Sequence, residues 1–182
     1  ASFVILFLRL TIDSHFQRKK YGICSPALRR GGGKTFCCAS HRQCNLYTKT
    51  KTMMKNNLIA LLDQTYPGVN ALSGSPVQED GSQKWVDFAA SFWHVDCVRG
   101  MSQTAFTERY RKWCKRNGYN LSGDKATEIY TSARDQIAVM PKDDLAKQLV
   151  RQAINSLNAI SKSVEQLKAE MLKLSAQLPE YP

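Results

Sequence analysis

The sequence predicts an all-α protein in which short helices pack around one long heptad-repeat helix, a coiled coil, with a basic N-terminal segment that is disordered or irregular. Three observations lead to this class. Apolar residues near the C-terminus alternate at spacings of three and four, as in a coiled coil. Residues 48–141 carry apolar residues at helical spacing, with no run that alternates as a strand does. The first fifty residues have neither period.

Four heptads of regular spacing predict the long C-terminal helix, which we place in residues 142–182. Its seam consists of Val150, Ala153, Leu157, Ile160, Val164, Leu167, Met171, Leu174 and Leu178. An isolated helix is marginal in water, so the seam needs a partner, either another helix of this chain or a second copy. A homo-oligomer formed through the coiled coil is therefore expected.

The N-terminal segment, residues 1–50, differs from the rest in charge and cysteine content. Residues 1–53 hold ten lysines and arginines against one carboxylate, Asp13, whereas the remainder holds sixteen basic and fourteen acidic residues. Four of the six cysteines also lie here. Because the segment mixes these residues without rhythm, the sequence predicts no recognisable fold for it.

The short apolar run and the cysteine spacing both favour a cytoplasmic location. The apolar run Phe3–Leu8 is too short to span a bilayer and lacks the flanks of a signal peptide. The cysteines have no regular spacing, which is typical of reduced thiols. We expect a cytoplasmic protein that does not associate with membranes.

Residues 51–141 are predicted to form a helical linker region. A first helix buries Met54, Leu58, Leu61 and Leu62 and ends by Tyr66, ahead of Pro67 and Gly68, and a loop follows through Gly81. Ser82 is expected to cap a strongly apolar helix that Gly100 ends. Its inward residues are Trp85, Phe88, Ala89, Phe92, Trp93 and Val95–Val98.

Two further helices follow, each with its own start signal. Ser102 is predicted to open a helix that ends at Asn117 and Gly118, and Ser122 opens the next. Pro141 is then placed as the first-turn proline of the long helix, with Asp143 and Asp144 at its N-terminus.

Two groups of residues resemble ligand-binding motifs. Gly31–Thr35 resembles part of a phosphate-binding loop, but Leu28 stands where the motif needs glycine and no strand leads into it. Soft ligands for zinc are present without a Cys-x-x-Cys pair, so free thiols are favoured over a zinc site. These residues are Cys24, Cys37, Cys38, His41 and Cys44. His94, one turn before Cys97, is interpreted as a packed histidine. No metal site is predicted.

A basic helix surface is the candidate for nucleic-acid binding. Its residues are Arg109, Arg111, Lys112, Lys115 and Arg116, with Tyr110 and Trp113 between them. Phosphate contacts need such a face, and a solvated helix surface explains the same pattern. A helix-turn-helix is disfavoured because the connection around Asn117–Leu121 is long and the following helix has few base-reading residues. Convergent carboxylates for metal-dependent catalysis are also missing from the pattern, so no catalytic residue is assigned.

Several runs in residues 51–182 resemble one family, the Piv-invertase-related insertion-sequence transposases, also called the one-ten family. The runs are Met54–Leu58, Leu62–Asn70, Asp80–Phe88, Trp93–Asp96, Trp113–Arg116, Pro141–Asp144 and Leu178–Pro182. Their order and spacing are similar to those of clostridial-type members. None of these runs is itself a catalytic motif.

The resemblance implies a role for residues 51–182 as the helical linker and coiled coil between two catalytic parts. In the family, a RuvC-like DEDD domain with metal-binding carboxylates precedes this region, and a domain with a serine nucleophile follows it. The resemblance also implies DNA and a guide RNA as partners, and a divalent metal as the cofactor of the full-length family, with no cofactor held by this chain. Upstream of about Tyr47 nothing resembles the family.

The expected function is therefore that of a transposase fragment for assembly and nucleic-acid positioning in DNA transposition, inactive alone. The change of composition near residue 50 suggests an out-of-frame segment joined to a genuine reading frame. Whether the chain is an enzyme is left open. The alternative function is a coiled-coil self-association module without a nucleic-acid role.

Overall fold

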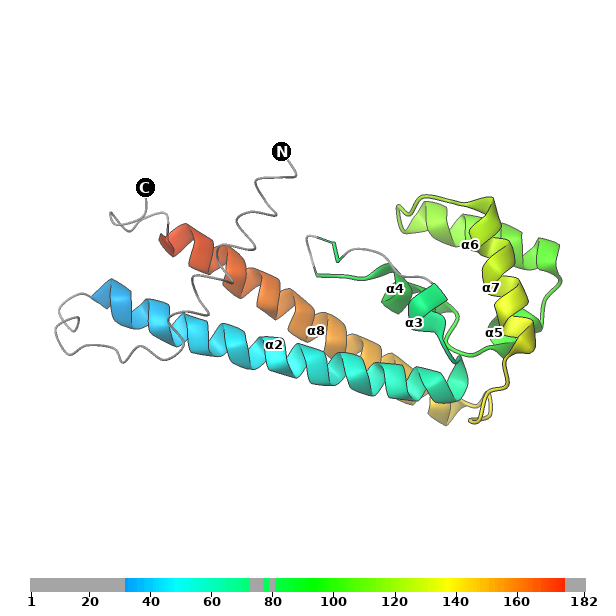
Figure 1. The fold of residues 1–182 in the computed structure, drawn as a ribbon, viewed down its shortest axis with the longest axis horizontal. Helices are drawn as coiled ribbons and strands as arrows, with labels where there is room; N and C mark the ends of the chain where they lie inside the picture. Colours follow the sequence, from blue (N-terminus) through cyan, green and yellow to red (C-terminus); the bar gives the residue numbers. More distant parts are fainter. Residues whose placement is uncertain (1–31, 73–76, 79–80, 176–182) are drawn as a thin grey trace. The chain divides into compact units, whose positions relative to one another are not determined.

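Every regular element in the described residues is a helix, which confirms the predicted all-α class. The computed structural model describes residues 32–72, 77–78 and 81–175. The chain divides into two units, Ala1–Ala39 and Ser40–Pro182, and the architecture below is that of the second. The helices are α2 (Gly32–Thr65), α3 (Val69–Leu72), α4 (Lys84–Ser91), α5 (Asp96–Arg99), α6 (Gln103–Arg116), α7 (Gly123–Asp135) and α8 (Asp144–Ser175) (Figure 1).

The two long helices, α2 and α8, form an antiparallel hairpin (Figure 1). At its closed end, the Gln64 carbonyl accepts hydrogen bonds of 2.9 Å from the backbone N–H groups of both Val139 and Met140, which lead into α8. Farther along, Lys51 Nζ of α2 lies 4.0 Å from Glu165 Oε1 of α8. The partner of the α8 seam is therefore a helix of the same chain.

A second heptad pattern on α2 matches the seam of α8. Residues at spacings of three and four along α2 are buried or partly buried, whereas most of the positions between them are exposed. They are Cys44, Tyr47, Lys51, Met54, Leu58, Leu61 and Thr65. Their spacing is that of an a/d seam, although three of them are polar or charged.

The helical start at Gly32 corrects the predicted boundary near residue 50. The N-terminal segment was predicted to be irregular throughout, but its last part continues the helix. Because Cys44, Tyr47 and Lys51 are weakly apolar or charged, the seam carries no hydrophobic signal there. Threonine hydroxyls on this stretch, including that of Thr48, donate to the carbonyl four residues earlier and so remain compatible with the helix.

Helix α4 buries its four large or central apolar residues. Trp85, Val86, Phe88 and Ala89 are all at most 3% exposed. Its N-cap is Gln83 rather than the predicted Ser82, and the Gln83 side chain is occupied by accepting a 2.6 Å hydrogen bond from the Trp85 indole. A short helix with so little exposed surface can pack against partners on both sides.

The predicted single helix from Ser82 to Val98 is interrupted after Ser91. The break arises because its backbone and side chains find partners elsewhere in the fold. Val95 N–H donates to the Thr65 carbonyl at 3.0 Å, and His94 Nε2 lies 3.0 Å from the Met140 carbonyl. The Asp96 N–H donates to His94 Nδ1 at 3.1 Å, so Nε2 is the donor to Met140. As predicted, His94 is packed, at 2% exposed.

Helix α6 packs on α4 through an aromatic cluster, and α7 packs on α5 and α6. The Phe88 ring centroid lies 4.7 Å from that of Phe92, 5.6 Å from that of Trp113 and 6.1 Å from that of Tyr110. These geometries are the stacked and edge-to-face arrangements that aromatic pairs prefer. The predicted caps of α6, Ser102 and Asn117, are confirmed.

Helix α8 is fixed by a cap at its start and by a close contact with Gly81 along its length. Asp143 caps the helix, with its carboxylate accepting a 2.7 Å hydrogen bond from Ala146 N–H, so α8 begins after the predicted first-turn proline, Pro141. Gly81 has a φ of +84°, and a Cβ there would meet Ser161 and Glu165 of α8 at 3.2 Å. Only glycine accommodates both the backbone angle and this contact.

Replacing Tyr66 by phenylalanine should stabilise the fold. Tyr66 is fully buried, and its hydroxyl has no hydrogen-bond partner among the described residues. Since an unpaired buried hydroxyl costs about 1–3 kcal/mol, we expect Tyr66→Phe to raise the free energy of unfolding in urea by about 1 kcal/mol. In the matched control, Tyr130→Phe, stability should fall, because the Tyr130 hydroxyl donates to the Met101 carbonyl at 2.9 Å.

The same variant should change the response to alkaline pH. Burial, and to a lesser degree Cys97, raises the pKa of Tyr66 above its ordinary value. A raised pKa gives stability that is present below the unfolded pKa of about 10 and is lost as the pH rises above it. The stability of Tyr66→Phe should therefore fall less steeply than that of the parent above pH 10. If the free energy of unfolding of the two proteins fell equally with pH above 10, the raised pKa of Tyr66 would be contradicted.

Replacing Lys51 by methionine should also stabilise the hairpin. Burial lowers the pKa of Lys51, with Glu165 acting in the opposite direction. A charged residue in a coiled-coil seam costs stability, and an ion pair of this length contributes little. We expect Lys51→Met to raise the free energy of unfolding by about 1 kcal/mol.

The control is Lys49→Met. Lys49 is exposed on the same helix, so this substitution should leave the free energy of unfolding unchanged. Because the Lys51 pKa is lowered, the parent should regain stability as the pH rises toward the unfolded value of about 10.4. The difference in the free energy of unfolding between Lys51→Met and the parent should therefore become smaller over that pH range. A destabilised Lys51→Met would mean that the ion pair to Glu165 outweighs the cost of burial.

Candidate nucleic-acid interface

The candidate interface is built on α6, whose inner face is fixed by large buried side chains. Phe106, Tyr110 and Trp113 are at most 4% exposed and pack on one another, with centroid distances of 6.0 Å and 5.6 Å between successive rings. Ser102 caps the N-terminus by accepting a 3.3 Å hydrogen bond from Ala105 N–H. The helix is therefore a rigid support for the residues on its outer face.

All five predicted contact residues are exposed on this helix. Arg109, Lys112 and Arg116 follow one another at spacings of three and four and so share a stripe. Arg111 and Lys115 lie four residues apart on a second stripe. The only acidic residue of α6 is Glu108. The helix surface is thus strongly cationic, and its charges do not all point the same way.

Two of the five arginines and lysines have close partners in the fold. Arg111 Nη1 lies 3.2 Å from Glu108 Oε1, an exposed pair that contributes little to stability. The Arg109 guanidinium lies 5.4 Å from the centroid of the Phe92 ring, and its Nη1 donates to Met101 Sδ at 3.8 Å. The cation–π contact orients Arg109 where α6 meets the turn after α4.

The remaining three cations are in no ion pair within the described part of the chain. Lys112 lies in the middle of the exposed face, whereas Lys115 and Arg116 occupy the last turn of α6. Cations at a helix C-terminus are favoured by the helix dipole, so Lys115 and Arg116 have a structural role available to them. Lys112 lies four residues after Glu108, an order in which an acid and a lysine stabilise a helix, so a structural role is available to it as well.

The predicted coiled-coil residues lie along the face of α8 that contacts α2. Val150, Ala153, Leu157 and Val164 are at most 7% exposed. Ile160, Leu167 and Met171 are partly buried. The side chain of Leu174, and Leu178 altogether, lie outside the described residues. Ile154 and Ser161, which the heptad pattern did not include, are also buried and broaden the seam.

The zinc candidates are only partly covered by the structure. Cys24 and the side chains of Cys37 and Cys38 lie outside the described residues. His41 and Cys44 are one turn apart on α2, and His41 Nε2 lies 2.8 Å from Asn45 Nδ2. Within the described residues, no group of three or more histidine, cysteine or acidic side chains is placed to hold a metal ion.

Two sets of residues have no counterpart among the sequence-predicted sites. One is the α2 seam, in which polar residues hide the heptad spacing. The other is the pair Lys147 and Arg151 on α8, whose signal in the sequence is the absence of any acidic residue between Asp144 and Glu165. Neither set can be found from apolar spacing alone. Finding them requires the helical position of each residue and its charge to be considered together.

Comparison with known proteins adds no relative. No protein-family model, curated protein or solved structure matches the chain. Among the described helices, none combines the length and the apolar character needed to cross a membrane.

Proposed function

We propose that the chain is part of an insertion-sequence transposase, in which it supplies the helical linker and coiled coil used for assembly and nucleic-acid positioning. The observation that carries this proposal is the cationic face of α6 on its rigid aromatic support. Five exposed cations with one acidic neighbour suit contact with a phosphate backbone, whose neutralisation dominates nucleic-acid affinity. DNA and a guide RNA are the partners that the family resemblance suggests.

The resemblance supports a scaffolding role, since three of its seven sequence runs fall at junctions between helices. Leu62–Asn70 spans the end of α2 and the start of α3, Trp93–Asp96 forms the turn between α4 and α5, and Pro141–Asp144 leads into α8. These segments meet through hydrogen bonds at the closed end of the hairpin. These positions support the proposal that the segments that resemble the family build the connector.

The hairpin suits the role of a spacer. Helix α8 has 32 residues and so extends over roughly 48 Å. Because its seam is matched by α2 within the chain, the pair is stiffer than a single helix. Such a spacer can hold nucleic acid at a fixed distance from the catalytic domains of the family. In the family those domains carry the carboxylates, the serine and the divalent metal.

A specific test reverses the charge of the first stripe. The triple variant Arg109→Glu, Lys112→Glu and Arg116→Glu should weaken binding to duplex DNA or structured RNA by about tenfold or more. It should also reduce the salt slope by about 2.7, since three phosphate contacts are lost. Electrophoretic mobility or fluorescence anisotropy at several salt concentrations measures both.

The control carries the same change of net charge elsewhere. Arg134, Lys142 and Lys162 are exposed on or near α7 and α8, and their reversal to glutamate should weaken binding much less. Equal losses in the two variants would mean that net charge alone matters and that the α6 stripe is merely solvated.

Self-association is the second candidate function, favoured by exposed apolar side chains near the closed end of the hairpin. Ile137 and Val139 are each 81% exposed, and Leu145 and Leu149, one turn apart on α8, are 65% and 38% exposed. The seam itself faces α2, so a homo-oligomer that leaves the hairpin intact would use these outer residues. Large exposed apolar side chains that cluster mark association surfaces.

Sedimentation at several concentrations tests the self-association. We expect a concentration-dependent dimer that Leu145→Glu combined with Leu149→Glu converts to a monomer. The control is Leu46→Glu, because Leu46 is exposed on α2 at 56% and lies outside this group. A chain that is monomeric at every concentration would leave the connector without this second activity.

A further inference from the structure

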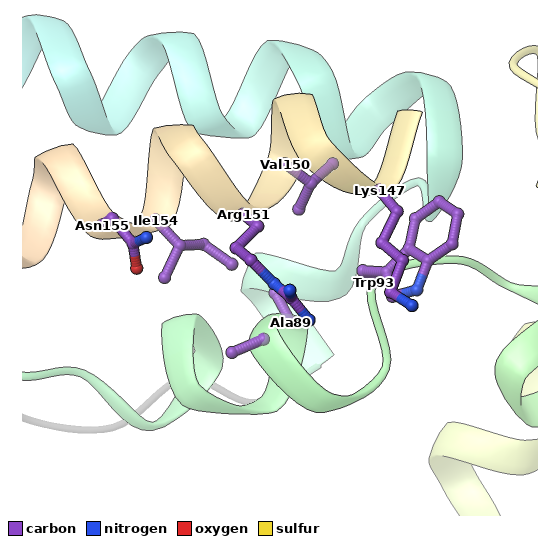
Figure 2. Close-up of a pocket in the computed structure, with 8 residues that line it drawn as sticks. Ala89, Trp93, Lys147, Val150, Arg151, Ile154 and Asn155 are labelled. Atoms are coloured by element: carbon purple, nitrogen blue, oxygen red, sulfur yellow. The ribbon is translucent and has the colours of Figure 1, made fainter. Parts of the chain in front are cut away.

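A small hollow between α4 and α8 combines features that the basic face of α6 lacks. Its volume is about 180 Å³, and it is lined by Ala89 and Trp93 on one side and by Lys147, Val150, Arg151 and Ile154 of α8 on the other (Figure 2). Val150, Ile154 and Ala89 are buried and form an apolar floor. The hollow exists because Ala89 is small where α4 faces α8.

The aromatic side of the hollow is the indole of Trp93. Helix α4 ends at Ser91, and the turn that follows is held by His94 and Val95 through hydrogen bonds to Met140 and Thr65. This turn leaves Trp93 only partly buried, whereas Trp85 and Trp113 are 3% and 4% exposed. Trp93 is thus a large, firmly positioned aromatic with a surface available to a ligand.

The other side of the hollow is cationic. Lys147 and Arg151 are exposed, extend from α8 toward α4 and lie one turn apart (Figure 2). No acidic side chain lines the hollow. Acids do lie close in sequence to the lining residues: Asp144 is one turn before Lys147 on α8, and Asp87 and Asp96 are two and three residues from Ala89 and Trp93. Like charges four residues apart repel each other, so Lys147 and Arg151 favour a bound anion.

We propose that the hollow binds one unpaired nucleotide of a single-stranded nucleic acid, with the base against Trp93 and the adjoining phosphates at Lys147 and Arg151. Bases stack on aromatic side chains wherever single strands are bound, and duplex bases are already stacked on each other. Asn155, which also lines the hollow, offers an amide to the base edge. The inference rests on the proposed nucleic-acid role and names the class of strand.

The size of the hollow agrees with this ligand. Sites for drug-sized molecules and cofactors occupy about 300–1,000 Å³, so 180 Å³ suits a single ring system and not a dinucleotide cofactor. An acidic protein segment would satisfy the two cations equally well. It would leave the partly exposed indole of Trp93 without the planar partner that a base provides.

Tryptophan fluorescence provides a direct test on the full chain. An oligothymidylate of about twelve nucleotides should quench the emission of Trp93 saturably, because a base stacks on its ring. Lys147→Gln with Arg151→Gln should weaken that binding by about tenfold and lower the salt slope by about 1.4, the value for two phosphates of a single strand. Trp93→Leu should abolish the quenching.

Matched controls separate this pocket from the α6 face. Lys142→Gln with Lys162→Gln removes two exposed cations elsewhere and should leave the quenching unchanged. The triple reversal on α6 should impair duplex binding and retain the quenching of Trp93. If Trp93→Leu fails to fold by circular dichroism, Arg151→Gln alone, at an exposed position, still reports on the pocket through the affinity.

The outcomes are distinguishable from those of the proposed function. If the parent chain binds no duplex but its Trp93 emission is still quenched saturably by oligothymidylate, the α6 interface is overturned and the pocket is supported. The pocket proposal is overturned if oligothymidylate does not quench Trp93, or if the quenching is unchanged when Lys147 and Arg151 are both replaced. It is also overturned if an acidic peptide binds at the site and oligothymidylate does not.

Discussion

The fold depends on the burial of α4 between the hairpin and the α6–α7 pair. Phe88 faces the aromatic cluster that includes Tyr110 and Trp113, while Ala89 faces α8. Both residues are fully buried. The eight-residue helix α4 is thus packed on both sides, and the position of α6 relative to the hairpin depends on it. Large-to-small changes at Phe88 would open a cavity shared by several rings, and enlarging Ala89 would force α4 away from α8.

Polar residues inside the hairpin explain why its two helices pair in one register. Lys51 approaches Glu165, and Ser161 is buried at 3% exposed beside Gly81, whose backbone leaves no room for a side chain. A shift of one turn would separate Lys51 from Glu165 and Gly81 from Ser161. Polar seam residues of this kind lower stability and fix register. The hairpin thus combines an apolar seam at its closed end with a polar, register-setting part farther along.

Much of the architecture could be predicted because local signals mark it. Ser102, Asn117 and Gly118 bound α6, and the apolar spacing of α8 locates its buried face. The early start of α2 could not be predicted, since Cys44, Tyr47 and Lys51 lack the apolar character that reveals a seam. The break after α4 depends on hydrogen bonds from Val95 to Thr65 and from His94 to Met140, which join distant parts of the chain. The basic face of α6 is readable from spacing alone, whereas the hollow at Trp93 arises from the pairing of α4 with α8.

The turn after α4 connects the two cationic surfaces physically. Arg109 of α6 is oriented by its contact with the ring of Phe92, and the next residue in the chain is Trp93, which lines the hollow. The position of both therefore depends on the same turn, which His94 holds against Met140. The two proposed contacts involve different forms of nucleic acid. Arg109 and Lys112 would contact a phosphate backbone, which a duplex provides, whereas stacking on Trp93 requires an unpaired nucleotide. Since one turn sets both, the two proposed sites would together bind nucleic acid where paired and unpaired strands meet.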